Sequence, residues 1–359
     1  MADQFKFTVE TNPNPIAAAE RRGFVANPPF GRVTTDHMAV VRWTKERGWH
    51  EPRITPYRAF TLDPCAAVLH YGQAIFEGMK AYQTSTGAVN LFRPEANARR
   101  FAASARRLAM PEAPIELFVE AVTQLVRIDA DWVGTGETSL YLRPFMFADD
   151  AFLGIRPALT HVFAVIASPI GDYFGKGAGP LSIWVTSDYT RAAPGGTGAA
   201  KCGGNYAAGL SAQQEAALHH CDQVLFLDAV HRRYVEELGG MNIFFGMADG
   251  SLITPPLGGT ILAGITRDSI IQLCRDRGLV VHERPYTLKE IRDDAQSGSL
   301  REIFACGTAA VVQSIGVLKD DAGEIRVPGG DLATSLRREL TSIQKGDTAD
   351  KHGWVYRVV

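Results

Sequence analysis

Residues 195–206 read GGTGAAKCGGNY and place five glycines around one lysine, Lys201. A lysine is normally a solvated surface residue, so its position in the most glycine-rich stretch of the chain needs a reason. A phosphate loop of the G-x-x-x-x-G-K-[ST] type does not fit, because Ala200 precedes the lysine and Cys202 replaces the hydroxyl residue. The dinucleotide motif G-x-G-x-x-G also fails, since Lys201 occupies its third glycine position.

Two interpretations of this stretch remain. One is a flexible surface loop. The other is that the glycines let the backbone approach a flat ligand while Lys201 forms a covalent imine, and both partial burial and nearby cations would favour this by lowering the pKa of the amine. A pyridoxal ring would also need a carboxylate for its ring nitrogen, a donor for its ring oxygen and a phosphate site.

Composition restricts the partners of the protein. The chain has 359 residues, of which 46% are hydrophobic, and its formal net charge of −2 is spread along the sequence. This balance argues against nucleic acid or an anionic membrane as the main partner. The longest apolar run, VFAVIA at 162–167, is too short to span a bilayer, and the charged N-terminus does not resemble a signal peptide. Five cysteines without a C-x-x-C pair indicate reduced thiols and a cytoplasmic protein.

Strand and helix signals are mixed along the chain, which predicts a mixed α/β (α+β) fold with partly antiparallel sheets. The expected domains are an N-terminal small domain at 1–174, a linker at 175–180 in the Gly-rich stretch GDYFGKGAGP, and a C-terminal large domain at 181–359 that carries Lys201. Hairpins are predicted from 37–43 with 53–60 and from 77–84 with 88–93, and helices at 93–110, 114–128, 207–219, 266–278, 288–295 and 331–344.

Candidate partners for a pyridoxal ring occur after the lysine. Glu236 and Glu237 lie in a predicted strand and point to opposite faces, so that one could face a ring and the other solvent. Residues 263–271, AGITRDSII, form a glycine-led helix start whose N–H groups suit a phosphate. Tyr206 follows Lys201 by five residues, and CGTAA at 306–310 predicts a turn with a hydroxyl and amides.

These motifs occur in an order that resembles a known family. KCGGNY, EELGGMN, GITR and CGTAA follow YGQAIFEGMKAY, LFRPEANARR and SLYLRP. Together they resemble the branched-chain amino acid aminotransferases, which are class IV, fold-type IV pyridoxal-phosphate enzymes, from about Phe30 to beyond Thr308. The resemblance implies a two-domain fold-type IV architecture with the cofactor between the domains.

The resemblance also implies roles for individual residues. Lys201 would hold pyridoxal 5'-phosphate as a covalent imine and later move the proton between the substrate α-carbon and cofactor C4′. Tyr206 would hold the ring oxygen, and Glu237, rather than Glu236, would keep the ring nitrogen protonated. The phosphate would lie with Arg100, rather than its helix neighbour Arg99, and with Gly264, Ile265, Thr266 and Thr308.

Substrate residues are implied in the same way. The activity would be a ping-pong transfer of the amino group of leucine, isoleucine or valine to 2-oxoglutarate, which gives glutamate and a branched-chain 2-oxo acid. Arg143 would meet the distal carboxylate of glutamate, which cannot lie unpaired among apolar groups. The α-carboxylate would meet Tyr71, Ala309 and Ala310, and the side chain would lie among Phe30, Phe76, Tyr141 and Tyr173, with Leu153 and Ile155 from the second subunit of a homodimer.

Other functions stay open at this point. D-amino acid transaminase and aminodeoxychorismate lyase share the fold, and a non-catalytic phosphometabolite-binding protein would also use a glycine loop. The C-x-x-C redox pair of animal members is replaced here by Ala310 and Gln313, so no thiol switch is expected, although Cys202 and Cys306 lie near the motifs. HHCD at 219–222 with His231 does not predict a metal site, because adjacent histidines at a helix end cannot both face one ion.

Overall fold

The computed structural model describes residues 5–175 and 179–359, which form two compact units. The first unit contains residues 1–173, 200–203 and 342–359, and the second contains 174–199 and 204–341. The units therefore do not follow the sequence-based division at 174 and 181. The lysine segment and the C-terminal residues were assigned to the C-terminal domain but group with the first unit, and residues 176–178 of the expected linker lie outside the described residues.

The first unit is built on a nine-stranded, mostly antiparallel sheet in the order β1-β3-β2-β8-β7-β5-β6-β18, with β4 paired to β7. The two predicted hairpins are confirmed as β2 with β3 and β5 with β6. The strands are β1 (Thr8–Val9), β2 (His37–Thr44), β3 (Gly48–Pro56), β4 (Ala74–Phe76), β5 (Met79–Gln83), β6 (Val89–Phe92), β7 (Ser139–Ala148), β8 (Thr160–Ile170) and β18 (Val355–Arg357).

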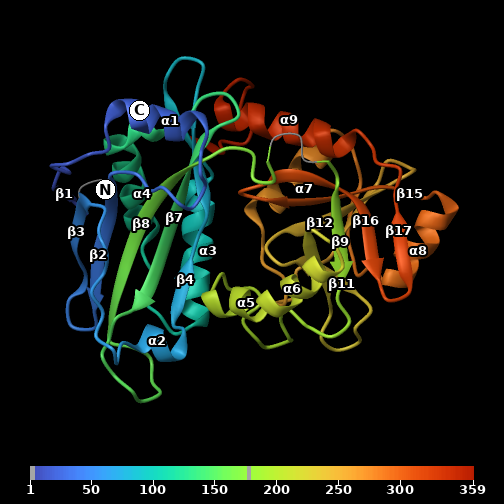
Figure 1. Cartoon of the computed structure of the whole chain (residues 1–359), viewed down its shortest axis with the longest axis horizontal. Coiled ribbons are helices and arrows are strands. Elements are labelled where there is room, and N and C mark those ends of the chain that lie inside the picture. Colours follow the sequence, from blue (N-terminus) through green and yellow to red (C-terminus); the bar gives the residue numbers. More distant parts are fainter. Residues whose placement is uncertain (1–4, 176–178) are drawn as a thin grey trace. The chain divides into compact units, whose positions relative to one another are not determined.

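Two long helices cover this sheet (Figure 1). α3 (Pro94–Arg107) begins with proline at its first position, where the missing N–H costs no hydrogen bond. α4 (Ile115–Ile128) buries Leu117, Phe118 and neighbouring apolar residues against β2 and β8, and each large side chain contributes about 1.5–3 kcal/mol of burial free energy. The shorter helices are α1 (Ala18–Ala26), α2 (Ala67–Tyr71) and η1 (Ala130–Trp132).

The second unit has its own nine-stranded sheet, in the order β11-β10-β9-β16-β15-β12-β13-β14, with β17 paired to β16. Parallel and antiparallel pairs are mixed in it, as the sequence predicts. The strands are β9 (Leu181–Val185), β10 (Gln223–Leu227), β11 (Val235–Leu238), β12 (Asn242–Met247), β13 (Leu252–Thr254), β14 (Val281–Glu283), β15 (Leu300–Gly307), β16 (Val311–Asp320) and β17 (Gly323–Arg326).

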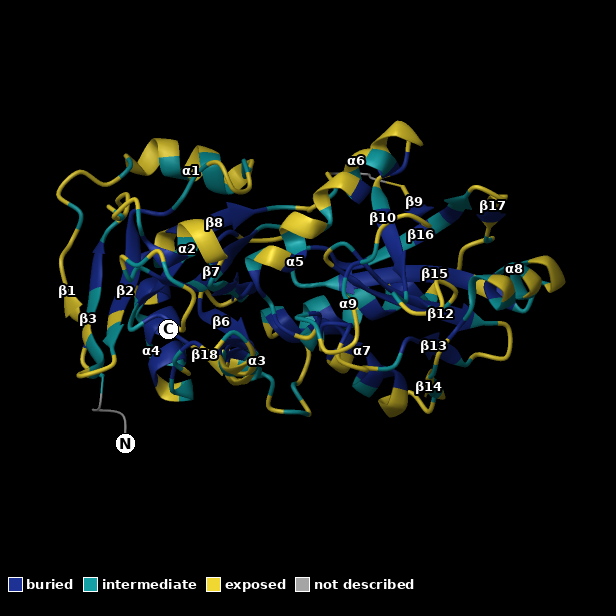
Figure 2. Cartoon of the chain, turned by 90° about the horizontal axis from the view of Figure 1, so that it is seen from below, coloured by how far each residue is buried: buried dark blue, intermediate teal, exposed yellow. Residues whose placement is uncertain are grey.

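The helices of this part of the chain are largely those predicted. The expected helix at 207–219 is two helices, separated at Gly209, whose N–H donates to the Tyr206 carbonyl three residues earlier. The strands are largely buried, whereas helices such as α8 expose an outer face (Figure 2). The helices are α5 (Gly203–Ala208), α6 (Leu210–Leu218), α7 (Ile265–Asp276), α8 (Leu288–Ser297) and α9 (Leu332–Lys345).

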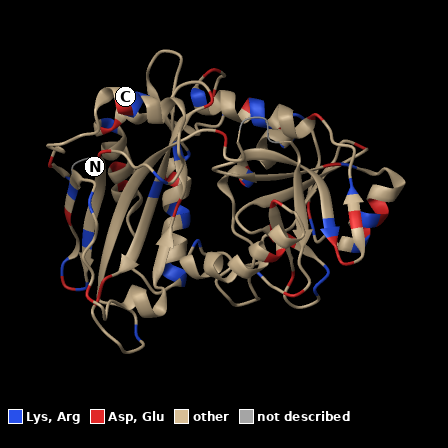
Figure 3. Ribbon diagram, in the orientation of Figure 1, with Lys and Arg blue, Asp and Glu red and all other residues tan. Residues whose placement is uncertain are grey.

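Charged side chains of both signs are interspersed over the ribbon of each unit (Figure 3). Within the described residues, no helix combines the length and the apolar character that crossing a membrane requires. In the same residues, no cluster of three or more histidine, cysteine or acidic side chains is arranged to hold a metal ion.

Candidate active site

Lys201 is fixed through its backbone to the first unit. Its N–H donates to Ser104 Oγ of α3 at 2.9 Å, and its carbonyl accepts from Phe76 N of β4 at 3.0 Å. The next residue, Cys202, forms an isolated bridge with Ile75 of β4. The glycine stretch therefore does not leave the lysine on a loose loop, and the surface-loop interpretation does not hold for it.

The surroundings of Lys201 lower the pKa of its amine to about 8. Burial is the largest cause, and the positive charge of Arg100 is the next, while the carboxylate of Glu77 acts in the opposite direction. A pKa near 8 leaves a sizeable fraction of neutral amine at physiological pH, which an exposed lysine does not have. The side chain is thus prepared to act as a nucleophile and as a base.

Arg100 lies beside this lysine, and Arg99 does not share its environment. Arg100 donates from Nε and Nη2 to the two carboxylate oxygens of Glu77, at 2.7 Å each, and Glu77 is fully buried. Arg99 pairs instead with exposed Glu95 one turn earlier on the same helix. We call Glu77, Arg100, Arg143 and Lys201 the lysine cluster.

Aromatic side chains predicted for the substrate pocket gather in the same unit. Arg143 lies over the Phe76 ring at 4.8 Å, and the Lys201 Nζ lies 4.9 Å from the centre of that ring. Arg143 also donates to the Tyr141 hydroxyl at 3.1 Å. Phe30 contacts Tyr141 and Tyr173 edge to face, with ring centres 5.1 and 6.1 Å apart.

Gly78 is required for this arrangement. A Cβ atom at position 78 would lie 2.1 Å from the Tyr141 hydroxyl, which is an impossible contact. Tyr141 therefore packs directly over the backbone of the FEGMK segment, and Arg143 is oriented by its hydroxyl.

Three predicted substrate residues lie at the surface of the unit. The Tyr71 hydroxyl donates to the Leu153 carbonyl and so connects α2 to the loop between β7 and β8. Leu153 is 61% exposed and Ile155 is 93% exposed. Neither side chain is packed within its own unit, so within one chain they do not contribute to the apolar pocket.

Glu237, in β11 of the second unit, is held by three donors. Leu262 N donates to Oε1 at 2.7 Å, Arg191 Nη1 lies 3.0 Å from the same oxygen, and Asn242 Nδ2 donates to Oε2 at 3.1 Å. Hydrogen bonds and a paired cation both favour the ionised form of a carboxylate. We call Arg191, Glu237, Asn242 and Leu262 the glutamate cluster.

Glu236 does not meet solvent, contrary to the sequence-based expectation for one member of the pair. It is 7% exposed, because Thr260 lies over its side of the strand and donates its hydroxyl to Oε1. Burial raises the pKa of Glu236, and Oε2 has no hydrogen-bond partner. The two adjacent carboxyl groups are therefore prepared differently, one with three donors and one with a single donor.

Asn242 joins Glu237 to the start of α7. Its Nδ2 also donates to the Leu262 carbonyl at 3.1 Å, and a Cβ at Gly264 would lie 1.9 Å from its Oδ1. Gly264 is the residue before α7, so Ile265 and Thr266 form the first turn, whose N–H groups have no acceptor within the helix. The predicted ring acid and the predicted phosphate amides are neighbours in this unit.

The turn at 308–311 lies close to the same residues. Asn242 pairs in register with Cys306 at the end of β15, and Arg337 of α9 donates to the carbonyls of Ala310 and Val312 at 2.8 and 2.9 Å. Val311 has φ +60°, a left-handed conformation that is unfavourable for a β-branched residue. The guanidinium of Arg337 thus stabilises a strained turn that contains Thr308, Ala309 and Ala310.

Glycines of the opening stretch allow close backbone approach. A Cβ at Gly198 would lie 2.3 Å from the Thr260 carbonyl, so only glycine fits there. Arg191 donates to the carbonyls of Gly198 and Thr260, at 3.3 and 2.7 Å. Tyr206, on α5, lies near Gly240, where a Cβ would be 3.8 Å from its ring.

Sequence reasoning missed Glu77, Ser104, Arg191, Asn242 and Arg337. Signals existed for some of them: Glu77 is an acidic residue between aromatic and glycine positions of a strand-rich motif, and Asn242 ends EELGGMN. Ser104 and Arg337 carry no such signal, because a serine or an arginine in a helix is common.

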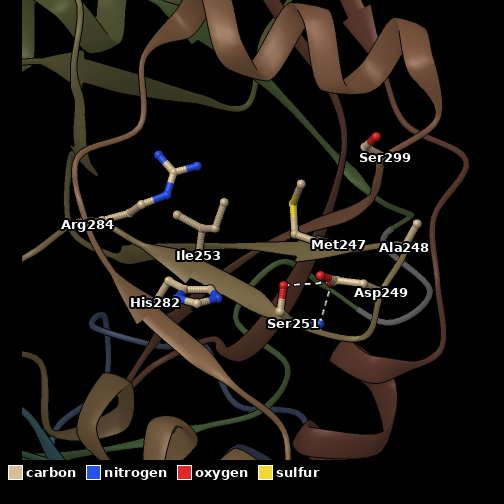
Figure 4. Close-up of a pocket in the computed structure, with 8 residues that line it drawn as sticks. All are labelled: Met247, Ala248, Asp249, Ser251, Ile253, His282, Arg284 and Ser299. Carbon is tan, nitrogen blue, oxygen red and sulfur yellow. Dashed lines mark hydrogen bonds between the residues drawn. The ribbon is translucent and has the colours of Figure 1, made fainter.

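A pocket of about 350 Å³ in the second unit contains none of the predicted site residues (Figure 4). Arg284, His282 and Ser299 line it, and Asp249 within it accepts hydrogen bonds from the amide and hydroxyl of Ser251. Its polar groups are already paired with one another or with nearby residues, as Arg284 is with Glu290. It is lined by Met247, Ala248, Asp249, Ser251, Ile253, His282, Arg284 and Ser299.

Comparisons with known proteins agree with the geometry of the two clusters. Residues 74–317 match the family model described as amino-transferase class IV. The chain belongs to this family of transaminases. The branched-chain-amino-acid aminotransferase of Mycolicibacterium smegmatis is 50% identical, with 98% of each chain covered. Within class IV, the chain therefore belongs with the branched-chain-amino-acid aminotransferases.

Solved structures show the same relationship. The Escherichia coli branched-chain amino acid aminotransferase superposes with a TM-score of 0.73 at 29% identity, covering 89% of this chain and 100% of that one. A second branched-chain amino acid aminotransferase, from T.th. and complexed with N-(5'-phosphopyridoxyl)-L-glutamate, superposes with a TM-score of 0.71 at 28% identity, covering 89% of this chain and 99% of that one. The fold is therefore that of the fold-type IV aminotransferases.

Proposed function

We propose that the protein uses pyridoxal 5'-phosphate to transfer the amino group of leucine, isoleucine or valine to 2-oxoglutarate, in a ping-pong reaction. The observation that carries this proposal is the lysine cluster, in which a half-buried amine with a pKa near 8 lies beside a paired arginine. The names of the relatives support branched-chain substrates, and the phosphopyridoxyl-glutamate complex of a relative supports both cofactor and glutamate.

The donor set of the chain fits this cofactor. An amine with a lowered pKa suits covalent attachment, a carboxylate with three donors suits a protonated pyridine nitrogen, and a guanidinium with a helix start suits a phosphate. Gly264 leaves room at the helix start that any Cβ would fill. When bound, the cofactor supplies a ring that withdraws the electron pair released as the substrate loses its α-proton.

The residues of the chain divide the remaining work. Lys201 Nζ anchors the cofactor, and after the substrate displaces it, the neutral amine takes the proton from the substrate α-carbon and delivers it to cofactor C4′. Glu237 stays ionised opposite the ring nitrogen because Leu262, Arg191 and Asn242 hold it. Tyr206 donates to the ring oxygen, and Arg100, Gly264, Ile265, Thr266 and Thr308 bind the phosphate.

Substrate selection follows from the aromatic side chains and two polar ends. Ala309 and Ala310, in the turn held by Arg337, bind the α-carboxylate with Tyr71. Phe30, Phe76, Tyr141 and Tyr173 exclude water from the branched side chain. Arg143, oriented by Tyr141, pairs with the distal carboxylate of glutamate, which would otherwise be too costly to bury.

The proposed enzyme is a homodimer. Leu153 and Ile155 expose apolar side chains on a surface loop, which is unfavourable in an isolated chain. In the dimer these residues contribute to the substrate pocket of the second subunit. We also propose a cytoplasmic location, which agrees with five cysteines that form no disulfide.

The test is chemical trapping. The purified protein is expected to be yellow, and borohydride should fix the cofactor to the peptide that contains Lys201. A screen of amino donors and oxo-acid acceptors then defines the substrates, and Arg143→Gln should weaken 2-oxoglutarate more than the branched oxo acids. A colourless protein without an adduct would refute the proposal, and a preference for D-amino acids would redirect it to the D-amino acid transaminases.

A further inference from the structure

Glu77 is the best buried carboxylate of the first unit, and no role has been given to it so far. Its side chain is fully buried, and both of its oxygens accept from Arg100, Nε to Oε1 and Nη2 to Oε2, at 2.7 Å. Gly78 N also donates to Oε2 at 3.2 Å. A two-pronged pair of this kind fixes the plane of the guanidinium as well as its position.

The pair uses one edge of the guanidinium. Nε and Nη2 are committed to Glu77, so Nη1 lies outside the pair and on the opposite edge of the plane. Arginine has many rotamers, and an unpaired one would sample them. A carboxylate that occupies one edge therefore decides the direction in which the remaining N–H groups point.

Glu77 and Arg100 are attached to the segments that hold Lys201. Glu77 N donates to the Pro144 carbonyl of β7 at 2.7 Å, next to Arg143. Ser104, one turn after Arg100 on α3, accepts from Lys201 N at 2.9 Å. The orientation of Arg100 is thus set relative to the lysine by one helix and two strands.

Charge in the cluster favours a dianion. Arg100 and Arg143 are cations and Glu77 is the carboxylate among the charged groups that act on Lys201. One negative charge neutralises part of the positive field and leaves an excess that suits a phosphate monoester. A neutral residue at position 77 would leave a buried guanidinium without its counter-ion.

We propose that Glu77 is a positioning residue that holds Arg100 in the orientation in which its outer N–H edge receives the phosphate of the cofactor. The inference rests on the proposed function, because it takes pyridoxal 5'-phosphate as the ligand. Glu77 touches neither the substrate nor the reacting atoms, so it acts through Arg100 alone.

The test compares two ligands that differ by the phosphate. Apoprotein of the wild type and of Glu77→Gln is titrated with pyridoxal 5'-phosphate and with pyridoxal. Because hydrogen bonds to charged groups contribute about 1.5–3 kcal/mol, Glu77→Gln should weaken pyridoxal 5'-phosphate roughly tenfold to a hundredfold, with little change for pyridoxal. Glu77→Asp, which keeps the charge, should recover part of the affinity.

Glu95→Gln is the matched control. Glu95 pairs with Arg99 on the same helix at 2.7 Å, but both side chains are largely exposed, at 59% and 61%. Exposed pairs contribute little, so this variant should bind both ligands like the wild type. Thermal unfolding of each apoprotein establishes that the variants are folded.

A double-mutant cycle keeps the test decisive if Glu77→Gln is unstable. In an Arg100→Gln background, loss of Glu77 leaves no buried unpaired cation, and it should cause no further change in the ratio of the two affinities. Equal losses for both ligands, or an unchanged ratio in Glu77→Gln, would overturn the inference. If the wild type itself does not prefer the phosphorylated ligand, the proposed function fails instead.

Discussion

Two buried arginine–glutamate pairs, one in each unit, have opposite arrangements. In Arg100–Glu77 both carboxylate oxygens are used by the arginine, and part of the guanidinium lies outside the pair. In Arg191–Glu237 the arginine is also committed to the carbonyls of Gly198 and Thr260, and the carboxylate collects further donors from Leu262 and Asn242.

The difference shows how one kind of ion pair serves two purposes. A carboxylate saturated by an arginine positions that cation, whereas a carboxylate surrounded by several donors is itself held in its charged form. The surrounding hydrogen bonds, and not the pair, decide which partner is presented to a ligand. The following predictions test this contrast, from the largest expected effect to the smallest.

Removal of the amine should have the largest effect. Lys201→Ala loses both the covalent anchor and the base, so we expect turnover to fall by roughly 10³-fold or more. The measurement is kcat with leucine and 2-oxoglutarate. Lys289→Ala, at an 84% exposed lysine paired with Asp293, is the control and should keep full turnover. Near-normal turnover of Lys201→Ala would remove the lysine cluster from the reaction.

The two adjacent glutamates should differ sharply. Glu237→Gln removes the charge that three donors hold, and we expect kcat to fall about 10²-fold while the fold is retained. Glu236→Gln should be nearly neutral, because burial already raises the pKa of that group and glutamine can still accept from Thr260. A reversed order of the two effects would assign the ring acid to Glu236.

Arg191 should matter less than the carboxylate it supports. In Arg191→Gln, Glu237 keeps the donors from Leu262 and Asn242, so we expect a loss in kcat of about tenfold. Arg275→Gln, at an arginine that is 56% exposed and paired with Glu283, is the control. If Arg191→Gln abolished turnover as fully as Glu237→Gln, the arginine would be more than a supporting group.

The smallest effect concerns protons on Lys201. Its pKa is lowered from 10.5 to about 8, so in the apoprotein its reaction with an amine-directed reagent should rise with pH and be half-maximal near pH 8. Lys289, whose pKa is raised by its hydrogen bond to Asp293, should stay slow at that pH.

The same shift has a sign for stability. The folded protein disfavours the charged amine, so Lys201 lowers the free energy of unfolding below pH 8. This penalty disappears as the pH rises from about 8 to 10.5, where the unfolded chain also loses the proton. Lys201→Met should remove this part of the pH dependence. An unchanged pH profile of unfolding in Lys201→Met would mean that the amine is solvated.

Much of the local structure could be predicted from the sequence. Proline at the start of α3 and the apolar spacing of α4 are local signals, and both helices lie within a few residues of their predicted bounds. Helical geometry also separated Arg100 from Arg99, because neighbours on a helix point in different directions. The division of the chain was less predictable, since residues 200–203 and 342–359 join the first unit through contacts far away in sequence.

By itself the sequence determined the chemical inventory of this protein: the lysine among glycines, the carboxylates of EELGGMN, the helix start at Gly264 and the order of motifs that marks the family. Tertiary structure alone decided the state of these groups. Glu77 and Arg100 are 23 residues apart, and Glu237 and Leu262 are 25 apart, so no local pattern pairs them. A side chain acquires its pKa and its orientation from burial and from partners, and both exist only after the chain has folded.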